Sequence, residues 1–260
     1  MSRDFTLAKY GELLETLQRA GYRMLSVGDF LAQEESFPCA ILRHDVDRRE
    51  ERALTMALLE KDRGIHSTYY FRQGRGLGKA EVVLRIKALG HEVGYHYEVL
   101  SKAGGDRDKA RKIFDDELSQ LRQMAEVRTA AMHGRPLSPW NNLSFWETCR
   151  PEDFGLMGEA YLSFGRLSQA VYLSDTGRGW NSGENLRDRF PDKGPATPGP
   201  FSSTGELIRF LREKPSPVVY LLAHPNRWTS GPGSWLFQWG EDACANWLKR
   251  KIMKNAPARR

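Results

Sequence analysis

Two aspartates with one residue between them, Asp45 and Asp47, end an apolar stretch that begins at Ile41. Side chains alternate along a strand, so both carboxylates point to one side while Val46 points away. Like charges at the end of a buried strand repel, and burial destabilises them unless a cation or a donor compensates. A metal ion would compensate these charges if one carboxylate bound the ion and the other acted beside it. The plainer alternative is that both aspartates cap a following helix, predicted over 49–63.

The elements around these aspartates alternate between predicted strands and helices. Predicted strands cover 39–43, 67–71, 91–96, 128–133, 170–174 and 218–223, and predicted helices cover 5–20, 49–63, 79–89, 106–125, 203–212 and 235–254. This order is typical of a mostly parallel α/β architecture. A chain of 260 residues with 40% apolar content can form one α/β barrel or two small domains. We expect a single domain over 1–260, with a loop-rich segment at about 134–203.

Three histidines and a third aspartate also stand at the carboxyl ends of predicted strands. They are His96, His133, Asp175 and His224. In a barrel these strand ends gather on one face, which is where the active site lies. We therefore expect these side chains to meet the aspartate pair, whereas His66 and His91 are interpreted as structural.

Two fragments of the loop-rich segment each combine an arginine with a tryptophan. Arg135 precedes Trp140, and Arg178 precedes Trp180. This combination suits stacking on a sugar face and binding of its hydroxyl or acid groups. Packing of the loops by aromatic side chains is the alternative interpretation.

The formal net charge of +6 comes largely from the last predicted helix and the tail. Such a charge favours an anionic partner, but a solvated basic tail explains it more simply. The sequence has no zinc-finger, helix-turn-helix or RNA-recognition signature, so no nucleic-acid partner is expected.

The positions of the cysteines and the lengths of the apolar runs limit the class of protein to which the chain can belong. Cys39, Cys149 and Cys244 are odd in number and far apart, which predicts neither a disulfide framework nor a thiolate zinc site. The longest apolar run, 218–223, is far shorter than the roughly 20 residues of a membrane span. The N-terminus carries charge where a signal peptide has its apolar core, so we expect a cytoplasmic protein.

Four motifs in order resemble the NodB-like polysaccharide deacetylase superfamily, in particular its divergent branch with an Arg-His-Asp-Val-Asp first motif. The motifs lie at 43–47, 90–96, 132–138 and 223–228. The resemblance implies an α/β fold, an irregular (β/α) barrel of the polysaccharide deacetylase type. It also implies removal of acetyl groups from N-acetylated sugars with a divalent metal, often zinc.

Carried over by position, the resemblance assigns four roles. Asp45 is the general base, Asp47 a metal ligand, His96 a second ligand and His224 the general acid. The second motif of the family normally supplies another histidine where this chain has Leu100. A catalytic zinc site takes three protein ligands and a water, so the third ligand must come from elsewhere. His133 is our first choice because it ends a neighbouring strand, and Glu98 is the second.

These observations favour a metal-dependent amide hydrolase that deacetylates an N-acetylated sugar or glycan precursor. The missing signal peptide points to a nucleotide-linked or lipid-linked sugar. Two alternatives stay open. One is a non-catalytic glycan or sugar-nucleotide binding module with a degenerate metal site, as Leu100 suggests. The other is a hydrolase of non-sugar amides.

Overall fold

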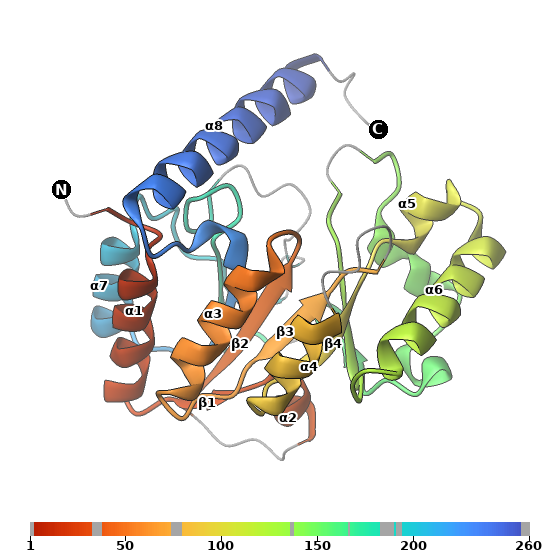
Figure 1. The fold of residues 1–260 in the computed structure, drawn as a ribbon, viewed down its shortest axis with the longest axis horizontal. Helices are drawn as coiled ribbons and strands as arrows, with labels where there is room; N and C mark the ends of the chain where they lie inside the picture. Colours follow the sequence, from red (N-terminus) through yellow and green to blue (C-terminus); the bar gives the residue numbers. More distant parts are fainter. Residues whose placement is uncertain are drawn as a thin grey trace.

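Eight strands form one parallel sheet that curls into an open barrel (Figure 1). The computed structural model describes residues 3–32, 38–73, 80–135, 138–165, 167–182, 190 and 194–255. The strands are β1 Arg23–Leu25, β2 Cys39–Val46, β3 Thr68–Phe71, β4 Glu92–Tyr97, β5 Thr129–Met132, β6 Gly158–Glu159, β7 Ala170–Ser174 and β8 Val218–Ala223. Their order is β6-β5-β4-β3-β2-β8-β7, and β1 also pairs with β2. Within the described residues β6 and β7 do not pair with each other, so the barrel is open there.

Strand β2 is the centre of this sheet, and all eight of its residues are buried. Its first half pairs with β1 and β8, and residues from Arg43 onward pair with β3. A parallel strand covered on both faces is expected to be continuously apolar. The polar residues at its end, from Arg43 to Asp45, therefore need specific partners.

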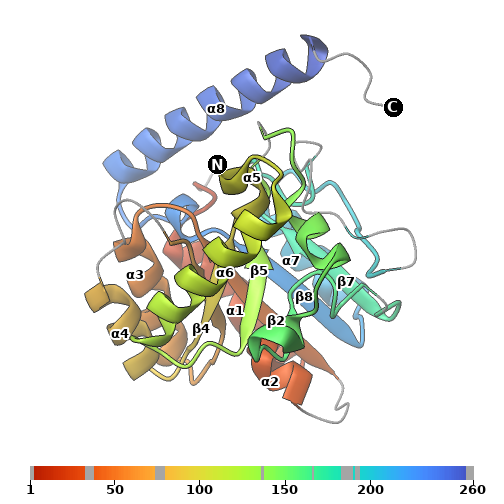
Figure 2. The same cartoon turned by 90° about the vertical axis from the view of Figure 1, so that its right-hand side faces the viewer.

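The helices lie around the curled sheet, as the view turned by 90° shows (Figure 2). They are α1 Leu7–Arg19, α2 Val27–Ala32, α3 Glu50–Lys61, α4 Ala80–Ala88, α5 Val99–Ala103, α6 Arg107–Arg122, α7 Thr204–Glu213 and α8 Pro232–Asn255. Three short 3-10 helices are η1 Asn142–Glu147, η2 Pro151–Phe154 and η3 Pro225–Arg227. Helix α1 begins where the Thr6 side chain accepts a hydrogen bond from the Lys9 backbone, and it buries Leu13, Leu14 and Leu17. None of the helices in the described residues is long and apolar enough to cross a bilayer.

A buried carboxylate fastens α3 to the sheet. Glu60 is fully buried and accepts hydrogen bonds from Tyr10 at 2.5 Å, Ser67 at 2.6 Å and Tyr69 at 2.8 Å. His44 Nε2 lies 2.7 Å from the same carboxylate. Such partners stabilise a buried carboxylate, and this cluster joins α1, β2, α3 and β3.

The architecture confirms the predicted mostly parallel α/β fold, with local differences. Strand β2 runs three residues beyond the predicted end, so Asp45 lies inside the strand and only Asp47 follows it. The predicted strands at 170–174 and 218–223 have the observed bounds. Elements β1, α2, α5 and β6 were not predicted, because each has six residues or fewer and shows no measurable periodicity. The predicted start of α4 at Lys79 lies outside the described residues.

Candidate metal centre

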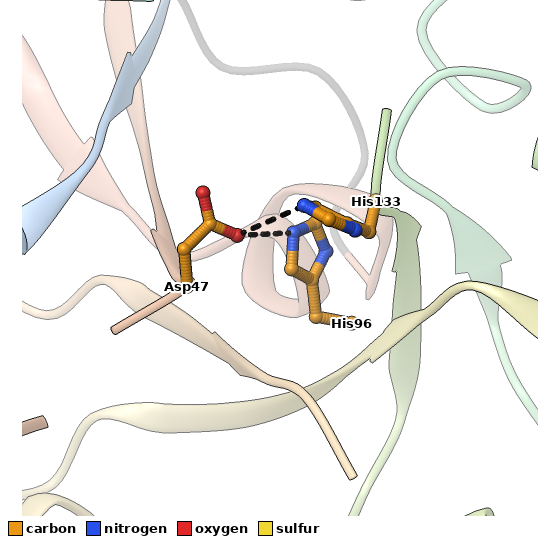
Figure 3. Close-up of side chains that lie close together, drawn as sticks. All are labelled: Asp47, His96 and His133. Atoms are coloured by element: carbon orange, nitrogen blue, oxygen red, sulfur yellow. Dashed lines mark ion pairs between the residues drawn. The ribbon is translucent and has the colours of Figure 1, made fainter. Parts of the chain in front are cut away.

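Three predicted ligands meet at the carboxyl ends of three strands (Figure 3). Asp47 directly follows β2, His96 lies in β4, and His133 directly follows β5. The Nε2 atoms of His96 and His133 lie 3.4 Å and 3.5 Å from Oδ1 of Asp47. One ligand atom from each residue lies within 4.8 Å of the others. One carboxylate and two imidazoles are a donor set that zinc and related divalent metals accept.

The second ring nitrogen of each histidine is held by an acceptor. Nδ1 of His96 lies 3.0 Å from the carbonyl oxygen of Ala131, and Nδ1 of His133 lies 2.8 Å from Oε2 of Glu98. Both partners only accept hydrogen bonds, which assigns the proton of each neutral ring to Nδ1. The Nε2 lone pairs are then directed at Asp47, as metal-binding histidines require.

One carboxylate oxygen of Asp47 lies in an environment that suits a bound cation. Its Oδ1 is buried and has no hydrogen-bond partner among the described residues. Burial alone would raise the pKa of Asp47, but positive charge on His133, His96 and His224 lowers it well below its ordinary value. With both neighbouring rings neutral, that positive charge has to come from a bound cation. A buried, ionised oxygen that two lone-pair nitrogens face fits a bound divalent ion.

Glu98 lies behind His133 instead of binding at the centre itself. Its Oε1 accepts from Arg72 at 2.7 Å, while its other oxygen holds His133. Burial opposes ionisation of Glu98, yet the hydrogen bond with His133 and the Arg72 cation lower its pKa to about 2. His133, and not Glu98, therefore faces Asp47, and Glu98 orients the His133 ring. Leu100, at the position of the missing histidine, is buried in the hydrophobic core.

Asp45, the second carboxylate of the pair, is bound by an arginine from its own strand. Arg43 Nε lies 2.8 Å from Oδ1, and Arg43 Nη2 lies 2.7 Å from Oδ2. Burial would raise the pKa of Asp45, but the Arg43 cation lowers it below its usual range. Oδ2 of Asp45 lies 3.6 Å from Nε2 of His96, so the ionised group borders the three ligands.

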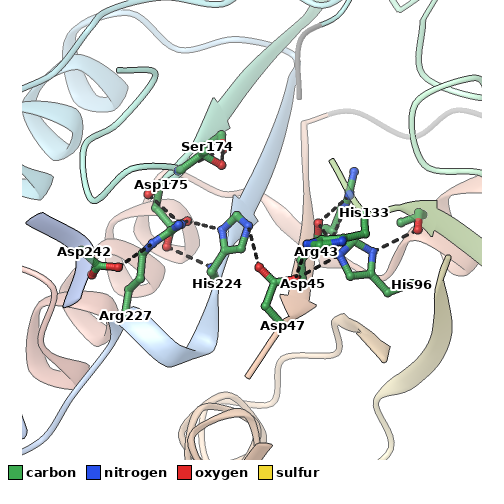
Figure 4. A network of polar contacts seen from close by, with 12 residues as sticks. Arg43, Asp45, Asp47, His96, His133, Ser174, Asp175, His224, Arg227 and Asp242 are labelled. Carbon is green, nitrogen blue, oxygen red and sulfur yellow. Dashed lines mark hydrogen bonds and ion pairs between the residues drawn. The ribbon is translucent and has the colours of Figure 1, made fainter. Parts of the chain in front are cut away.

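His224 reaches the centre from the opposite side, at the end of β8 (Figure 4). Its Nε2 lies 4.0 Å from Oδ2 of Asp47, and its Nδ1 lies 2.6 Å from Oδ1 of Asp175. Asp175 also accepts from Arg227 at 2.9 Å and from the Trp228 indole at 3.0 Å. Burial would raise the pKa of Asp175, but His224 and Arg227 keep it below the ordinary value. The His224 ring is thus fixed with Nε2 toward Asp47.

The four predicted substrate-binding residues divide into two pairs. Arg135 and Trp140 lie on the segment after β5, with side chain and residue exposures of 46% and 43%. The Arg135 guanidinium lies 3.8 Å from Glu98, next to the ligand His133. Arg135 therefore borders the site from solvent, whereas the exposed ring of Trp140 packs over Gly105. The motif residues Pro136 and Leu137 between them lie outside the described residues.

Arg178 and Trp180 require a correction. Trp180 is fully buried, and its indole donates to Thr204 at 3.0 Å, which leaves no ring face for a sugar. The Arg178 side chain is 8% exposed, and its Nη1 lies 3.3 Å from Asp242. These residues pack the loop after β7, which was the alternative interpretation of the fragment.

Two roles were missed from the sequence although the signal was present. Arg43 stands two residues before Asp45, so the same strand alternation that aligns Asp45 with Asp47 also aligns Arg43 with Asp45. Asp175 was noted at a strand end without being assigned to His224. Parallel pairing of β7 with β8 brings Ser174 beside Leu222, so Asp175 follows beside Ala223, the residue before His224.

No family model matches the sequence, and no curated protein does. Similar solved structures include a CE4 family pseudoenzyme from Bacillus anthracis, with 14% identity, 79% of this chain covered and a TM-score of 0.43. This chain spans 60% of the pseudoenzyme's length. The peptidoglycan deacetylase PdaC from Bacillus subtilis has 11% identity, coverage of 86% and 100% of the two chains, and a TM-score of 0.40. PdaA from Bacillus subtilis, a family 4 carbohydrate esterase, has 12% identity, coverage of 92% and 84%, and a TM-score of 0.38.

These similar structures are family 4 carbohydrate esterases. At these identities and scores they carry nothing about activity or substrate. Activity and substrate are therefore inferred from the residues of this chain.

Proposed function

We propose that this chain is a metal-dependent amide hydrolase that removes an acetyl group from an N-acetylated sugar or glycan precursor. The observation that carries the proposal is the buried Oδ1 of Asp47, which has no hydrogen-bond partner among the described residues and is faced by Nε2 of His96 and of His133. Asp47, His96 and His133 are the residues that would hold the divalent ion. Zinc is the metal that this donor set suits best.

When bound, a divalent ion supplies a Lewis acid that polarises an amide carbonyl and makes a water molecule more acidic. The protein residues then have to move two protons. One proton leaves the attacking water, and another must reach the leaving amine. Asp45 and His224 flank the three ligands on opposite sides of Asp47, which suits one residue for each task (Figure 4).

Asp45 is the proposed general base. Arg43 keeps its carboxylate ionised and fixed in direction, because both oxygens are held by one guanidinium. Each carboxylate oxygen has a second lone pair, so this pairing leaves Asp45 able to accept a proton from water. A base that is ionised over the whole neutral range needs no prior deprotonation.

His224 is the proposed general acid. Asp175 accepts from its Nδ1, which fixes the orientation of the ring. Nε2 then carries the proton that the leaving amine takes up. Arg227 and Trp228 hold Asp175 in place, so the orientation of His224 is set by three further side chains.

The sugar is proposed to bind where Arg135 and Trp140 border the site. An exposed indole offers a flat apolar face for the ring of a sugar, and a guanidinium donates several hydrogen bonds to hydroxyl or acid groups. The Trp140 ring packs directly over Gly105, because a Cβ atom added at Gly105 would lie 2.4 Å from the ring. A nucleotide-linked or lipid-linked sugar is the proposed form of the substrate.

The test is acetate release from a panel of N-acetylated sugars by purified protein supplied with zinc, cobalt or manganese. We expect release that is lowered about 10²–10⁴-fold by Asp45→Asn or His224→Asn. Asp47→Ala is expected to abolish both release and metal content. The exposed Asp108→Asn on α6 serves as the control and keeps full activity. No release with any metal, together with no bound ion in the wild-type protein, would refute the hydrolase.

The same panel separates the two alternatives. Tight sugar binding with no metal content and no acetate release would identify a glycan or sugar-nucleotide binding module. Hydrolysis of N-acyl amines or cyclic ureides, with acetylated sugars left intact, would identify a hydrolase of non-sugar amides. The assembled ligand set of Asp47, His96 and His133 favours catalysis over the binding module.

A further inference from the structure

Helix α8 packs against the rest of the molecule with polar side chains. Gln238 is fully buried, and Arg49 binds both Gln238 and Glu241 at 2.7 Å. Further along the helix, Asn246 donates to the carbonyl oxygen of Gly177 at 2.7 Å. A surface helix normally turns its apolar stripe toward the core. In α8 the inward face is mostly polar, although Trp235 also lies there and its indole donates to the carbonyl oxygen of Asp4 at 2.6 Å.

The outward face of α8 carries large apolar side chains. The exposed ones are Leu236 at 61%, Phe237 at 60%, Trp239 at 50%, Trp247 at 57% and Leu248 at 46%. Leu236, Gly240, Trp247 and Lys251 follow each other at helical spacing, opposite Gln238 and Asp242. In Figures 1 and 2 the last turns of α8 extend past all the other elements. Apolar side chains gathered on a projecting helix mark an interaction surface.

The charge of the last part of the sequence indicates which partner covers this face. From Trp247 to the end of the chain, every charged residue is basic: Lys249, Arg250, Lys251, Lys254, Arg259 and Arg260. Among the described side chains, the Lys251 ammonium lies 4.2 Å from the centroid of the Trp247 ring. Tryptophan, phenylalanine and leucine beside lysine and arginine are typical of helices that lie in the interface of an anionic membrane. A second copy of the chain would bring the same cations against each other, whereas anionic lipid supplies the opposite charge.

We propose that the outer face of α8, formed by Leu236, Phe237, Trp247, Leu248 and Lys251, docks on the surface of an anionic lipid bilayer. The helix would lie in the headgroup region with its apolar side chains below the phosphates. Polar contacts of Gln238 and Asn246 would keep its inner face on the barrel. This mode of binding requires no membrane-spanning segment.

The docked helix adjoins the candidate metal centre. Asp242 on the inner face of α8 has its Oδ1 3.9 Å from Nε of Arg227, which in turn binds Asp175, the partner of His224. A bilayer held by the outer face of α8 would therefore be separated from the His224 side of the site by the thickness of this helix. The proposal concerns binding alone and is independent of the catalytic proposal.

The test is sedimentation of the full-length protein with vesicles of phosphatidylglycerol and phosphatidylcholine, compared with vesicles of phosphatidylcholine alone. We expect tighter binding to the anionic vesicles, by at least about tenfold at low salt, and a decrease of that binding in high salt. Leu236→Ser combined with Trp247→Ser should weaken binding at least about tenfold because both apolar anchors are lost. Lys251→Glu should weaken binding to anionic vesicles only.

The matched control is Leu84→Ser combined with Leu162→Ser, which removes two side chains exposed at 47% and 45% elsewhere on the surface. This control should bind vesicles as the wild type does, and circular dichroism should report the same folded content for every variant. Absence of binding to anionic vesicles, or equal loss in the control, would overturn the proposal. So would a dimer in analytical ultracentrifugation that only the α8 variant dissociates, because the face would then be covered by a second copy.

Discussion

At the scale of single residues, the candidate centre depends on which nitrogen of each histidine carries its proton. A backbone carbonyl oxygen holds His96, whereas a charged side chain, Glu98, holds His133. Substitution of Glu98 can therefore lower the metal affinity at His133 without changing a proposed metal ligand. Second-layer partners of metal-binding histidines typically contribute a factor of about 10–100 in metal affinity.

Substitution of Glu98 is predicted to lower metal affinity in a graded way. Glu98→Gln keeps an oxygen that accepts from His133 but loses the charge, so we expect about tenfold weaker zinc binding. Glu98→Ala loses both, and we expect about a hundredfold weaker binding. Competition with a chromophoric chelator measures both values. Glu147→Gln, which removes an exposed carboxylate paired with Arg107, is the control, and equal affinities across the series would contradict the supporting role.

The pair of Arg43 and Asp45 gives a second prediction, on stability. Both side chains are buried, and Arg43 also lies over the Tyr161 ring, 4.5 Å from its centroid. Arg43→Met leaves the Asp45 carboxylate buried without its cation, which should destabilise the fold by about 3–5 kcal/mol in urea unfolding. The double variant Arg43→Met with Asp45→Leu removes both charges and should recover most of that loss. A double variant no more stable than Arg43→Met would contradict this account.

At the scale of elements, the cluster around Glu60 couples the pH of the solution to the attachment of α3. Burial would raise the pKa of Glu60, but His44 and the hydroxyl donors lower it to about 2 from an ordinary value of 4.5. The ionised form is thus stabilised in the folded state. This contribution is complete above about pH 4.5 and is lost as the pH falls toward about 2.

Acid should therefore weaken the wild-type protein more than a Glu60→Gln variant. The shift corresponds to about 3 kcal/mol of unfolding free energy that the wild type loses between about pH 5 and pH 2. The variant should be less stable at neutral pH, and this part of its pH dependence should be absent. Urea unfolding at several pH values measures both effects. Parallel pH profiles for the two proteins would show that Glu60 is not the responsible group.

Local sequence features determine which elements and site residues could be predicted from the sequence. The strands ending at Asp47, His96, His133 and His224 were predictable because apolar runs and their polar ends are local features, and a parallel sheet brings such ends to one edge. Local features do not report contacts between loops. The burial of Trp180 depends on Phe5 and Trp228, which come from opposite ends of the chain. The inverted face of α8 depends likewise on Arg49, nearly two hundred residues earlier.

At the scale of the whole molecule, the centre joins the carboxyl ends of β2, β4 and β5, so an ion bound there would stabilise the folded sheet. A ligand at a hundred times its Kd contributes about 2.7 kcal/mol to the free energy of unfolding when it binds only the native state. Because Asp47, His96 and His133 come together only on folding, binding to the unfolded chain should be weak.

Zinc in such excess should raise the melting temperature by about 5–10 °C, as expected for a domain of this size. The chelator EDTA should reverse the rise without unfolding the protein, because the apolar core does not depend on the ion. Differential scanning fluorimetry measures the shift, and Asp47→Ala should show none. An equal shift in the Asp47→Ala variant would mean that zinc binds elsewhere.

The position of β2 at the centre of the sheet also bears on how the site is prepared for a ligand. Its amides, paired on both sides and fully buried, should exchange with solvent only when the whole domain unfolds. Asp45 and Asp47 are therefore held by the slowest-exchanging part of the protein. His133 directly follows β5 as Asp47 follows β2, whereas Arg135 and Trp140 lie further along the segment after β5. Asp45 and Asp47 are thus preorganised before any ligand arrives, and the entropic cost of ordering on binding falls on the segment that carries Arg135 and Trp140.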